Sequence, residues 1–259
     1  MLSGKGVDRL LHIKSHLETG FNVEVCVRNI LTGEGSPAGS CRSMQSFCLA
    51  KAMQEWFEFN SLAGAKHWFY LSGEFQRKLF SIDSDRSNLL AKIIGFGFIL
   101  LSDCENIIDW FCDVDGIYNP AYISKVNMVE FHAFNIVLAA RGDMISLAAR
   151  CDEFTALPAK GNMAKYALDN DFLAALAKGD QQRMETAMSG LLAPKIVRSR
   201  GALESGYTLD LISSLPVIYA KLAWRHGFML HVDSALVPKA WLPVAPLNVY
   251  EKTFNCLYV

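Results

Sequence analysis

Apolar residues spaced three and four apart along most of the chain limit its fold more than any other feature. The clearest run predicts a helix from about Ser40 to Phe59, with one apolar face formed by Met44, Phe47, Cys48, Ala52 and Trp56. The same spacing predicts a helix from about Val7 to Leu17 and another from Leu62 to Phe80, which Gly73 could interrupt. Because such faces must be covered by neighbouring elements, the pattern favours a packed array of helices.

Two short segments with the same residue order mark places where helices join. Residues 140–143 read Ala-Arg-Gly-Asp, and residues 177–180 read Ala-Lys-Gly-Asp. In each segment a basic residue closes one helix, the glycine takes the left-handed position after it, and the aspartate caps the next helix. Successive helical hairpins of this kind occur in α-solenoids, but two copies leave open whether the chain is a true repeat.

Strand signals are weak. Residues 22–30 contain alternating valines, which fit a strand, but a helix continuing from the first one is an equal alternative. Residues 228–232 are short and favour β structure. We therefore expect an all-α protein: a compact multi-helix array of antiparallel helical hairpins, allowing a short minor β element, in a single domain spanning residues 1–259.

Composition narrows the functional classes. Hydrophobic residues make up 51% of the chain, charged residues 20%, and the formal net charge is −1, so no overall positive charge attracts nucleic acid or an anionic membrane. The most apolar run, residues 93–101, is far shorter than the roughly 20 residues that span a bilayer. The seven cysteines are scattered without paired spacing, as is typical of reduced, buried thiols. We expect a cytoplasmic protein.

Motifs that carry chemistry are absent from the sequence. It has no nucleotide-binding glycine loop, no nucleophile elbow and no zinc-protease motif. His12 and His16 have a spacing compatible with a metal, but no third ligand is evident, so two solvated histidines are the favoured interpretation. Residues 113–116 resemble the start of a calcium loop, but the required glycine and glutamate positions do not fit. We expect no catalysis, no cofactor and no metal.

One stretch has an unusual charge pattern. Residues 93–124 contain no lysine or arginine but do contain Asp103, Glu105, Asp109, Asp113 and Asp115. Three of these carboxylates are spaced four residues apart, which stacks them on one helix face at a small cost in helix stability. The face is either simply solvated, or neutralised by a basic segment such as residues 195–200, or a docking surface for a basic partner.

The C-terminal half resembles a known family. Residues 162–194 form a helix, a Gly-Asp junction and a second amphipathic helix ending at proline. The pattern continues with Leu215-Pro216, Ala220-Lys221-Leu222-Ala223-Trp224, Gly227, Val232-Asp233, Leu236-Val237-Pro238 and Leu242-Pro243. Over roughly residues 160–250 the chain resembles the bacterial immunity protein 49 family of polymorphic toxin systems. The N-terminal 160 residues are similar only in being helical and of suitable length.

The resemblance implies a mainly helical protein encoded beside a nuclease toxin, often of the HNH/GHH class, and brings no catalytic residues. Its signature residues look structural, so they do not identify the surface that binds the toxin. We expect the partner-binding residues on the acidic helix and the loop after it: Asp103, Glu105, Asp109, Trp110, Asp113, Asp115 and Tyr118. The rival interpretation is a helical-repeat scaffold with an unrelated partner. An enzyme would need a pocket with several perturbed titratable groups.

Overall fold

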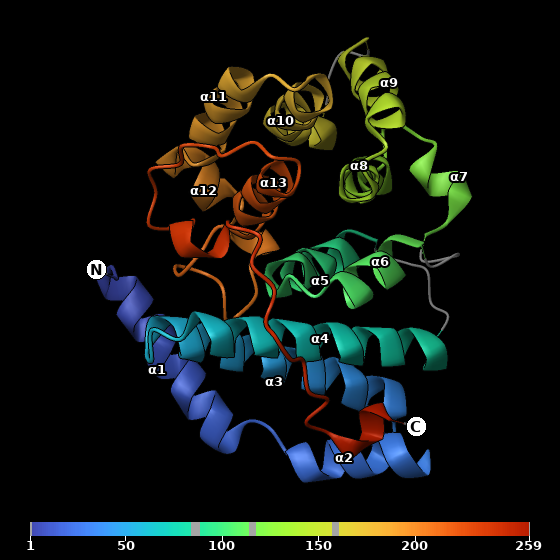
Figure 1. Ribbon diagram of the computed structural model, residues 1–259, viewed down its shortest axis with the longest axis vertical. Helices are drawn as coiled ribbons and strands as arrows, with labels where there is room; N and C mark the ends of the chain where they lie inside the picture. The colour runs from blue at the N-terminus through green and yellow to red at the C-terminus, as the bar shows by residue number, and fades with distance from the viewer. Residues whose placement is uncertain (1, 84–88, 114–117, 157–160, 259) are drawn as a thin grey trace.

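We describe the protein from a computed structural model, which covers residues 2–83, 89–113, 118–156 and 161–258 and omits the side chains of residues 89–94, 96, 161 and 162. Every regular element in these ranges is a helix (Figure 1). The expected all-α class is therefore confirmed. The short β element that the sequence allowed is absent from the described residues, and residues 228–232 form an irregular segment because they follow the end of a helix at Gly227.

Four helices build the N-terminal half: α1 (Gly4–Thr19), α2 (Val23–Thr32), α3 (Pro37–Phe57) and α4 (Leu62–Ile82). The two long helices α3 and α4 pack side by side as an antiparallel pair (Figure 1). Residues 23–30 are helical, and they belong to a separate helix because Asn22 caps α2 by accepting the N–H of Val25. Gly73 does not interrupt α4. A Cβ atom there would lie 2.9 Å from a side-chain carbon of Ile99, so glycine permits a close helix approach.

The middle of the molecule holds α5 (Leu89–Ser102), α6 (Glu105–Asp113), the short α7 (Pro120–Ile123) and α8 (Val129–Arg141). Helix α5 lies between α4 on one side and α13 (Ser214–Arg225) on the other (Figure 1). Gly97 makes the second contact possible, since a Cβ atom at that position would lie 2.1 Å from side-chain carbons of Ile218.

Helices α9 (Met144–Ala156), α10 (Ala167–Lys178) and α11 (Gln181–Leu191) lie at the top of Figure 1, and α12 (Pro194–Ser199) lies below α11 beside α13. Short 3-10 turns form at Gly161–Tyr166 and Gly201–Leu203. Both junctions form as the sequence predicts. Gly142 and Gly179 have φ angles of 74° and 68°, and the aspartate after each glycine accepts a backbone N–H from the next helix.

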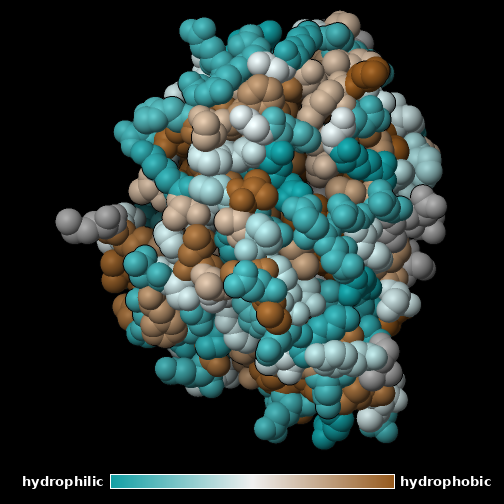
Figure 2. Space-filling model, in the orientation of Figure 1, coloured by the Kyte–Doolittle hydropathy of each residue, from teal (hydrophilic) through white to brown (hydrophobic). Residues whose placement is uncertain are grey.

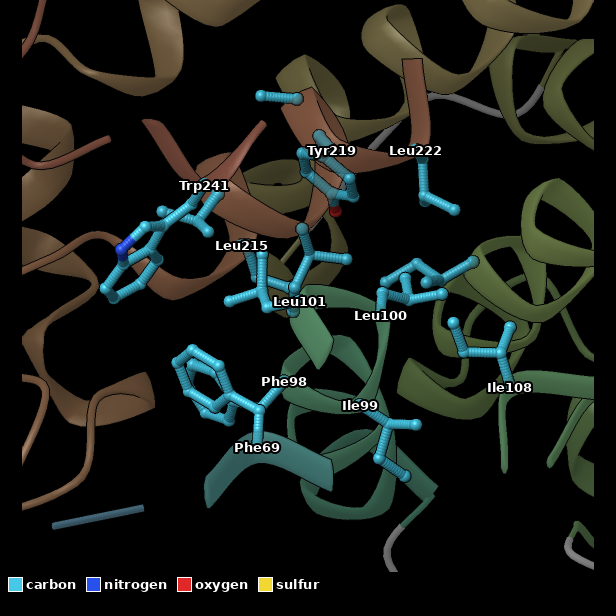
Figure 3. Packing of buried hydrophobic residues seen from close by; sticks show 14 of the residues in the cluster. Phe69, Phe98, Ile99, Leu100, Leu101, Ile108, Leu215, Tyr219, Leu222 and Trp241 are labelled. Carbon is cyan, nitrogen blue, oxygen red and sulfur yellow. The ribbon is translucent and has the colours of Figure 1, made fainter. Parts of the chain in front are cut away.

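The hairpins do not extend into an open solenoid. Helix α13 returns across the array and packs against both α5 and α10. Figure 3 shows the resulting core, in which Leu215, Tyr219 and Leu222 of α13 lie near Leu100 and Leu101 of α5. Because α13 packs against both early and late helices, the helices form a compact array, as expected from the sequence.

A strap of irregular chain completes the fold. After a 3-10 turn at Lys239–Trp241, residues 242–258, called here the C-terminal strap, run across α4 and α3 to reach α2 (Figure 1). They end in a second turn, Asn255–Leu257, whose Cys256 and Leu257 are buried. All seven cysteines are free thiols, and all but the half-buried Cys26 are buried. None of the described helices is long and apolar enough to cross a bilayer.

Candidate functional site

Helix α6 presents the acidic face that the sequence predicts. Its inward stripe, formed by Cys104, Ile107, Ile108 and Phe111, is buried against α4, α5 and α8. On the opposite side Glu105, Asp109 and Asp113 are exposed. The helical spacing of 3.6 residues per turn accounts for both faces.

The three exposed carboxylates differ in their neighbours. Glu105 Oε2 lies 2.6 Å from Nη2 of Arg225, which reaches it from the end of α13. Asp109 and Asp113 form no ion pair within the described part of the chain. The basic segment proposed as a neutralising partner does not reach this face through Arg200, whose guanidinium binds Asp169 instead. Two carboxylates on α6 are therefore without an ion pair, although Arg141 Nε donates to the carbonyl of Cys112, the residue before Asp113, at 2.5 Å.

The two aromatic residues expected on this surface are half-buried. Trp110 packs edge-on against Phe80, with ring centroids 6.0 Å apart, and lies beneath the guanidinium of Arg77 at 5.9 Å. Tyr118 packs against Phe134 with centroids 4.6 Å apart. Both rings are held by their own chain, so each can offer only part of its surface to a partner. Asp115 lies outside the described residues.

Asp103 does not lie on this surface. The prediction that it contacts a partner is wrong, because its side chain is 0% exposed. Its backbone adopts a left-handed conformation with φ of 57° between α5 and α6, which turns the carboxylate into the interior. There Oδ2 lies 2.7 Å from Nζ of Lys66 on α4, and Oδ1 lies 2.6 Å from Nζ of Lys221 on α13.

Asp103, Lys66 and Lys221, called here the Asp103 cluster, link three parts of the fold: α4, α13 and the chain between α5 and α6. Lys221 also donates to the carbonyls of Trp241, Leu242 and Pro243 at 3.0, 3.2 and 3.0 Å. Burial lowers the pKa of Lys221 from 10.5 to about 8, and the Asp103 carboxylate opposes that lowering. A carboxylate with two buried lysines is costly to break, because either charge left alone would be unpaired in the interior. The cluster therefore has a structural role: it holds these elements together.

The sequence carries one signal for this cluster besides the charge pattern of residues 93–124. Lys66 and Lys221 each lie within an apolar stretch of helix, where a lysine is buried only when a carboxylate or carbonyl oxygens meet it. Two such lysines indicate at least one buried acid. Asp103, which follows the apolar helix α5 directly, is the nearest candidate in the acidic stretch.

A second buried network connects α8, α10 and α13. Tyr219 Oη donates to Asp169 Oδ1 at 2.8 Å and lies 3.2 Å from Nε2 of His132, while Arg200 binds both carboxylate oxygens of Asp169. The ring of His132 stacks on Tyr166 with centroids 4.7 Å apart. Burial lowers the pKa of His132 to about 4 and raises that of Tyr219 well above its usual value. These groups are fixed inside the protein, so they hold helices together and do not reach a substrate at the surface.

The two histidines with metal-compatible spacing behave as surface groups. His12 is exposed, and Nδ1 of His16 lies 2.9 Å from the hydroxyl of Tyr207. Across residues 2–83, 89–113, 118–156 and 161–258, no group of three or more His, Cys, Asp or Glu side chains is arranged to hold a metal ion. A shallow polar depression near His12 is lined by Lys5, Asp8, Arg9 and Asp210. Arg9 there donates to the carbonyls of Gly206 and Leu209, which links α1 to the chain before α13.

Residues 145–241 match the model of a family described as immunity protein 49, which confirms the resemblance seen in the sequence. No curated protein and no solved structure matches the chain. The matched segment runs from α9 to the turn at Lys239–Trp241 and includes Asp169, Tyr219 and Lys221. It thus contains parts of both buried networks, whereas α6 and the C-terminal strap lie outside it.

Proposed function

Since residues 145–241 match the model of the immunity protein 49 family, we propose that this chain is the immunity protein of a nuclease toxin of the HNH/GHH class. It binds the toxin stoichiometrically in the cytoplasm of the producing cell and occludes the active site or the DNA-binding cleft. It acts by binding alone and catalyses no reaction. The family match is the observation that carries this proposal.

The surface we propose for toxin binding is the exposed side of α6 with the half-buried aromatic residues beside it: Glu105, Asp109, Asp113, Trp110 and Tyr118. A nuclease cleft is basic because it binds DNA phosphates. Carboxylates on a rigid helix complement such a cleft and raise the rate of association, and partly exposed aromatic rings slow dissociation. Asp109 and Asp113 are the strongest candidates, since neither forms an ion pair in the described residues.

Co-expression tests the function. The toxin encoded beside this chain's gene is expressed with and without the protein, and growth and co-purification are measured. We expect the protein to restore growth and to purify as a complex with the toxin. Equal killing in its presence, with no complex at micromolar concentrations, would show that the proposal is wrong.

Charge reversal tests the surface. Asp109→Lys with Asp113→Lys should weaken binding most at low ionic strength, where long-range attraction is least screened. A matched control is Glu153→Lys with Asp171→Lys, which changes the net charge equally at exposed positions on α9 and α10. If the α6 variant and the control bind equally well at low salt, the α6 face is only solvated.

A further inference from the structure

The C-terminal strap exposes an uncharged apolar surface. Residues 242–250 read Leu-Pro-Val-Ala-Pro-Leu-Asn-Val-Tyr and contain no ionisable acid or base apart from the tyrosine. Val244 is 44% exposed and Val249 is 64% exposed. Pro243, Ala245 and Pro246 are also exposed. Single exposed aliphatic residues are ordinary, but a continuous uncharged segment on the surface is characteristic of interaction sites.

Buried charges fix the backbone of this segment. Lys66 Nζ donates to the carbonyl of Ala245 at 2.5 Å, and Oδ2 of Asp103 accepts the N–H of the same residue at 3.2 Å. Tyr250 donates its hydroxyl proton to the carbonyl of Ser102 and accepts the N–H of Leu247. Because its backbone is held in this way, the strap can contact a partner without first losing much conformational entropy.

Carboxylates lie at both ends of the apolar segment, residues 242–250. At its start, Ala245 donates its N–H to Asp103, two residues before Glu105, the first residue of α6, whose side chain is 53% exposed. At its end, Glu251 lies near His67 together with Glu55, and the two carboxylates oppose the lowering of the His67 pKa by burial. Figure 2 shows brown, apolar atoms in patches down the middle of this face, along the path that the strap follows in Figure 1, among teal side chains.

Two cations near the strap are already paired with carboxylates. Arg225 lies between Glu105 and Asp103, and Nζ of Lys252 lies 3.3 Å from Oε2 of the buried Glu74. Glu251 and Asp109 have no ion pair in the part of the chain that the structure describes. Glu251 therefore leaves unpaired negative charge next to the apolar segment, and Asp109 adds more one turn beyond Glu105 on α6, which favours a positively charged partner.

We propose that the exposed side of residues 243–249, together with the adjacent Glu251 and the carboxylates of α6, is a docking surface for a basic protein surface that also offers an apolar contact. This inference rests on the proposed function, and the partner that binds this surface is the nuclease toxin. The strap supplies the desolvated apolar contact, and the carboxylates guide association and exclude acidic partners. The toxin-binding surface then extends from α6 onto the strap, with the Asp103 cluster beneath the junction.

Paired substitutions at the exposed valines test the surface. Val244→Lys with Val249→Lys removes the apolar contact and adds charge that a basic partner repels. Val244→Glu with Val249→Glu removes the same contact but adds charge that such a partner attracts. The control is Val7→Lys with Leu11→Lys on α1, where the two side chains are 47% and 59% exposed. All four positions are at the surface, so the melting temperatures should stay close to that of the unmodified protein.

Binding is measured by calorimetry at physiological ionic strength with the catalytically inactivated nuclease domain of the toxin encoded beside this chain's gene. We expect the lysine pair to weaken binding at least 30-fold, the glutamate pair to weaken it at least tenfold less than the lysine pair does, and the α1 control to bind normally. Equal losses for the lysine and glutamate pairs would overturn the basic character of the occupant.

The outcomes separate this inference from the proposed function. If the unmodified protein does not bind the toxin, both are overturned. If it binds and the lysine pair binds equally well, only the docking surface is overturned. If the lysine pair leaves toxin binding intact but abolishes self-association in analytical ultracentrifugation, the strap contacts a second copy of this chain, and the inference is again overturned.

Discussion

His132 should make the stability of the protein depend on pH. It is 0% exposed, and burial lowers its pKa from 6.5 to about 4. The groups that face it are Tyr166, Tyr219, Asp169 and Arg200; of these, Asp169 raises the pKa and Arg200 lowers it. The tautomer follows from the hydrogen bonds. Since Tyr219 gives its proton to the Asp169 carboxylate, His132 must donate from Nε2 to the tyrosine oxygen.

The direction of the effect follows from this arrangement. Nδ1 of His132 is then the nitrogen that takes up a proton, and it has no hydrogen-bond partner among the described residues. The folded protein therefore disfavours the charged ring, and between pH 6.5 and 4 the unfolded chain binds more protons. The stability from the neutral ring is complete above the unfolded pKa of 6.5 and is lost as the pH falls towards the folded pKa of about 4.

The magnitude follows from the same shift. The lowering of the His132 pKa from 6.5 to about 4 corresponds to about 3 kcal/mol in the free energy of unfolding. This stability is lost between these two pH values, and about 2 kcal/mol of it is already lost by pH 5. The assay is urea unfolding at pH 7.5, 6.0 and 5.0, with His132→Phe as the comparison because phenylalanine keeps the stacking on Tyr166 but does not titrate. His67, whose pKa burial also lowers, is present in both proteins, so the difference between them isolates His132. Equal pH dependence in the two proteins would refute the reasoning.

Further variants test the packing and the surface. Asp103→Asn should lower the free energy of unfolding by about 3–5 kcal/mol, measured by denaturant titration, because it removes the negative charge that faces two buried lysines. Gly97→Ala should cost about 1–3 kcal/mol in the same assay, since its Cβ would overlap Ile218, whereas Gly4→Ala, with open space around it, should cost little. Trp110→Ala should weaken toxin binding by about 2 kcal/mol in calorimetry if the exposed part of the ring contacts the toxin. Chelation should leave the melting temperature unchanged, and a fall on chelation would contradict a metal-free fold.

The parts of the fold that were predictable from the sequence depend on local physics. The Gly-Asp junctions at residues 142–143 and 179–180 combine a left-handed glycine with a capping aspartate, and both need only neighbouring residues to form. The two faces of α6 also follow from spacing along one helix. Residues 22–30 were ambiguous because alternating valines fit a strand. The structure resolves this ambiguity, because the side chain of Asn22 accepts the N–H of Val25 and begins a helix.

The features that were not predictable depend on residues far apart in the sequence. Asp103 looked like one of several acidic surface residues, and only the convergence of α4, α5 and α13 brings Lys66 and Lys221 to it. The strap has no periodic sequence pattern. Its backbone is held by side chains from other elements, and the sequence of the strap itself does not reveal them. The candidate surface was therefore predictable along α6, where periodicity applies, but not along residues 243–249.

Titration of the toxin's nuclease activity tests the central claim most directly. Purified toxin from the neighbouring gene is mixed with increasing amounts of this protein, and cleavage of DNA is followed. Stoichiometric inhibition predicts that activity falls in proportion to the added protein and is abolished when the amounts are equal. Full cleavage in the presence of a several-fold excess of the protein would contradict the claim that it is the immunity protein of that nuclease.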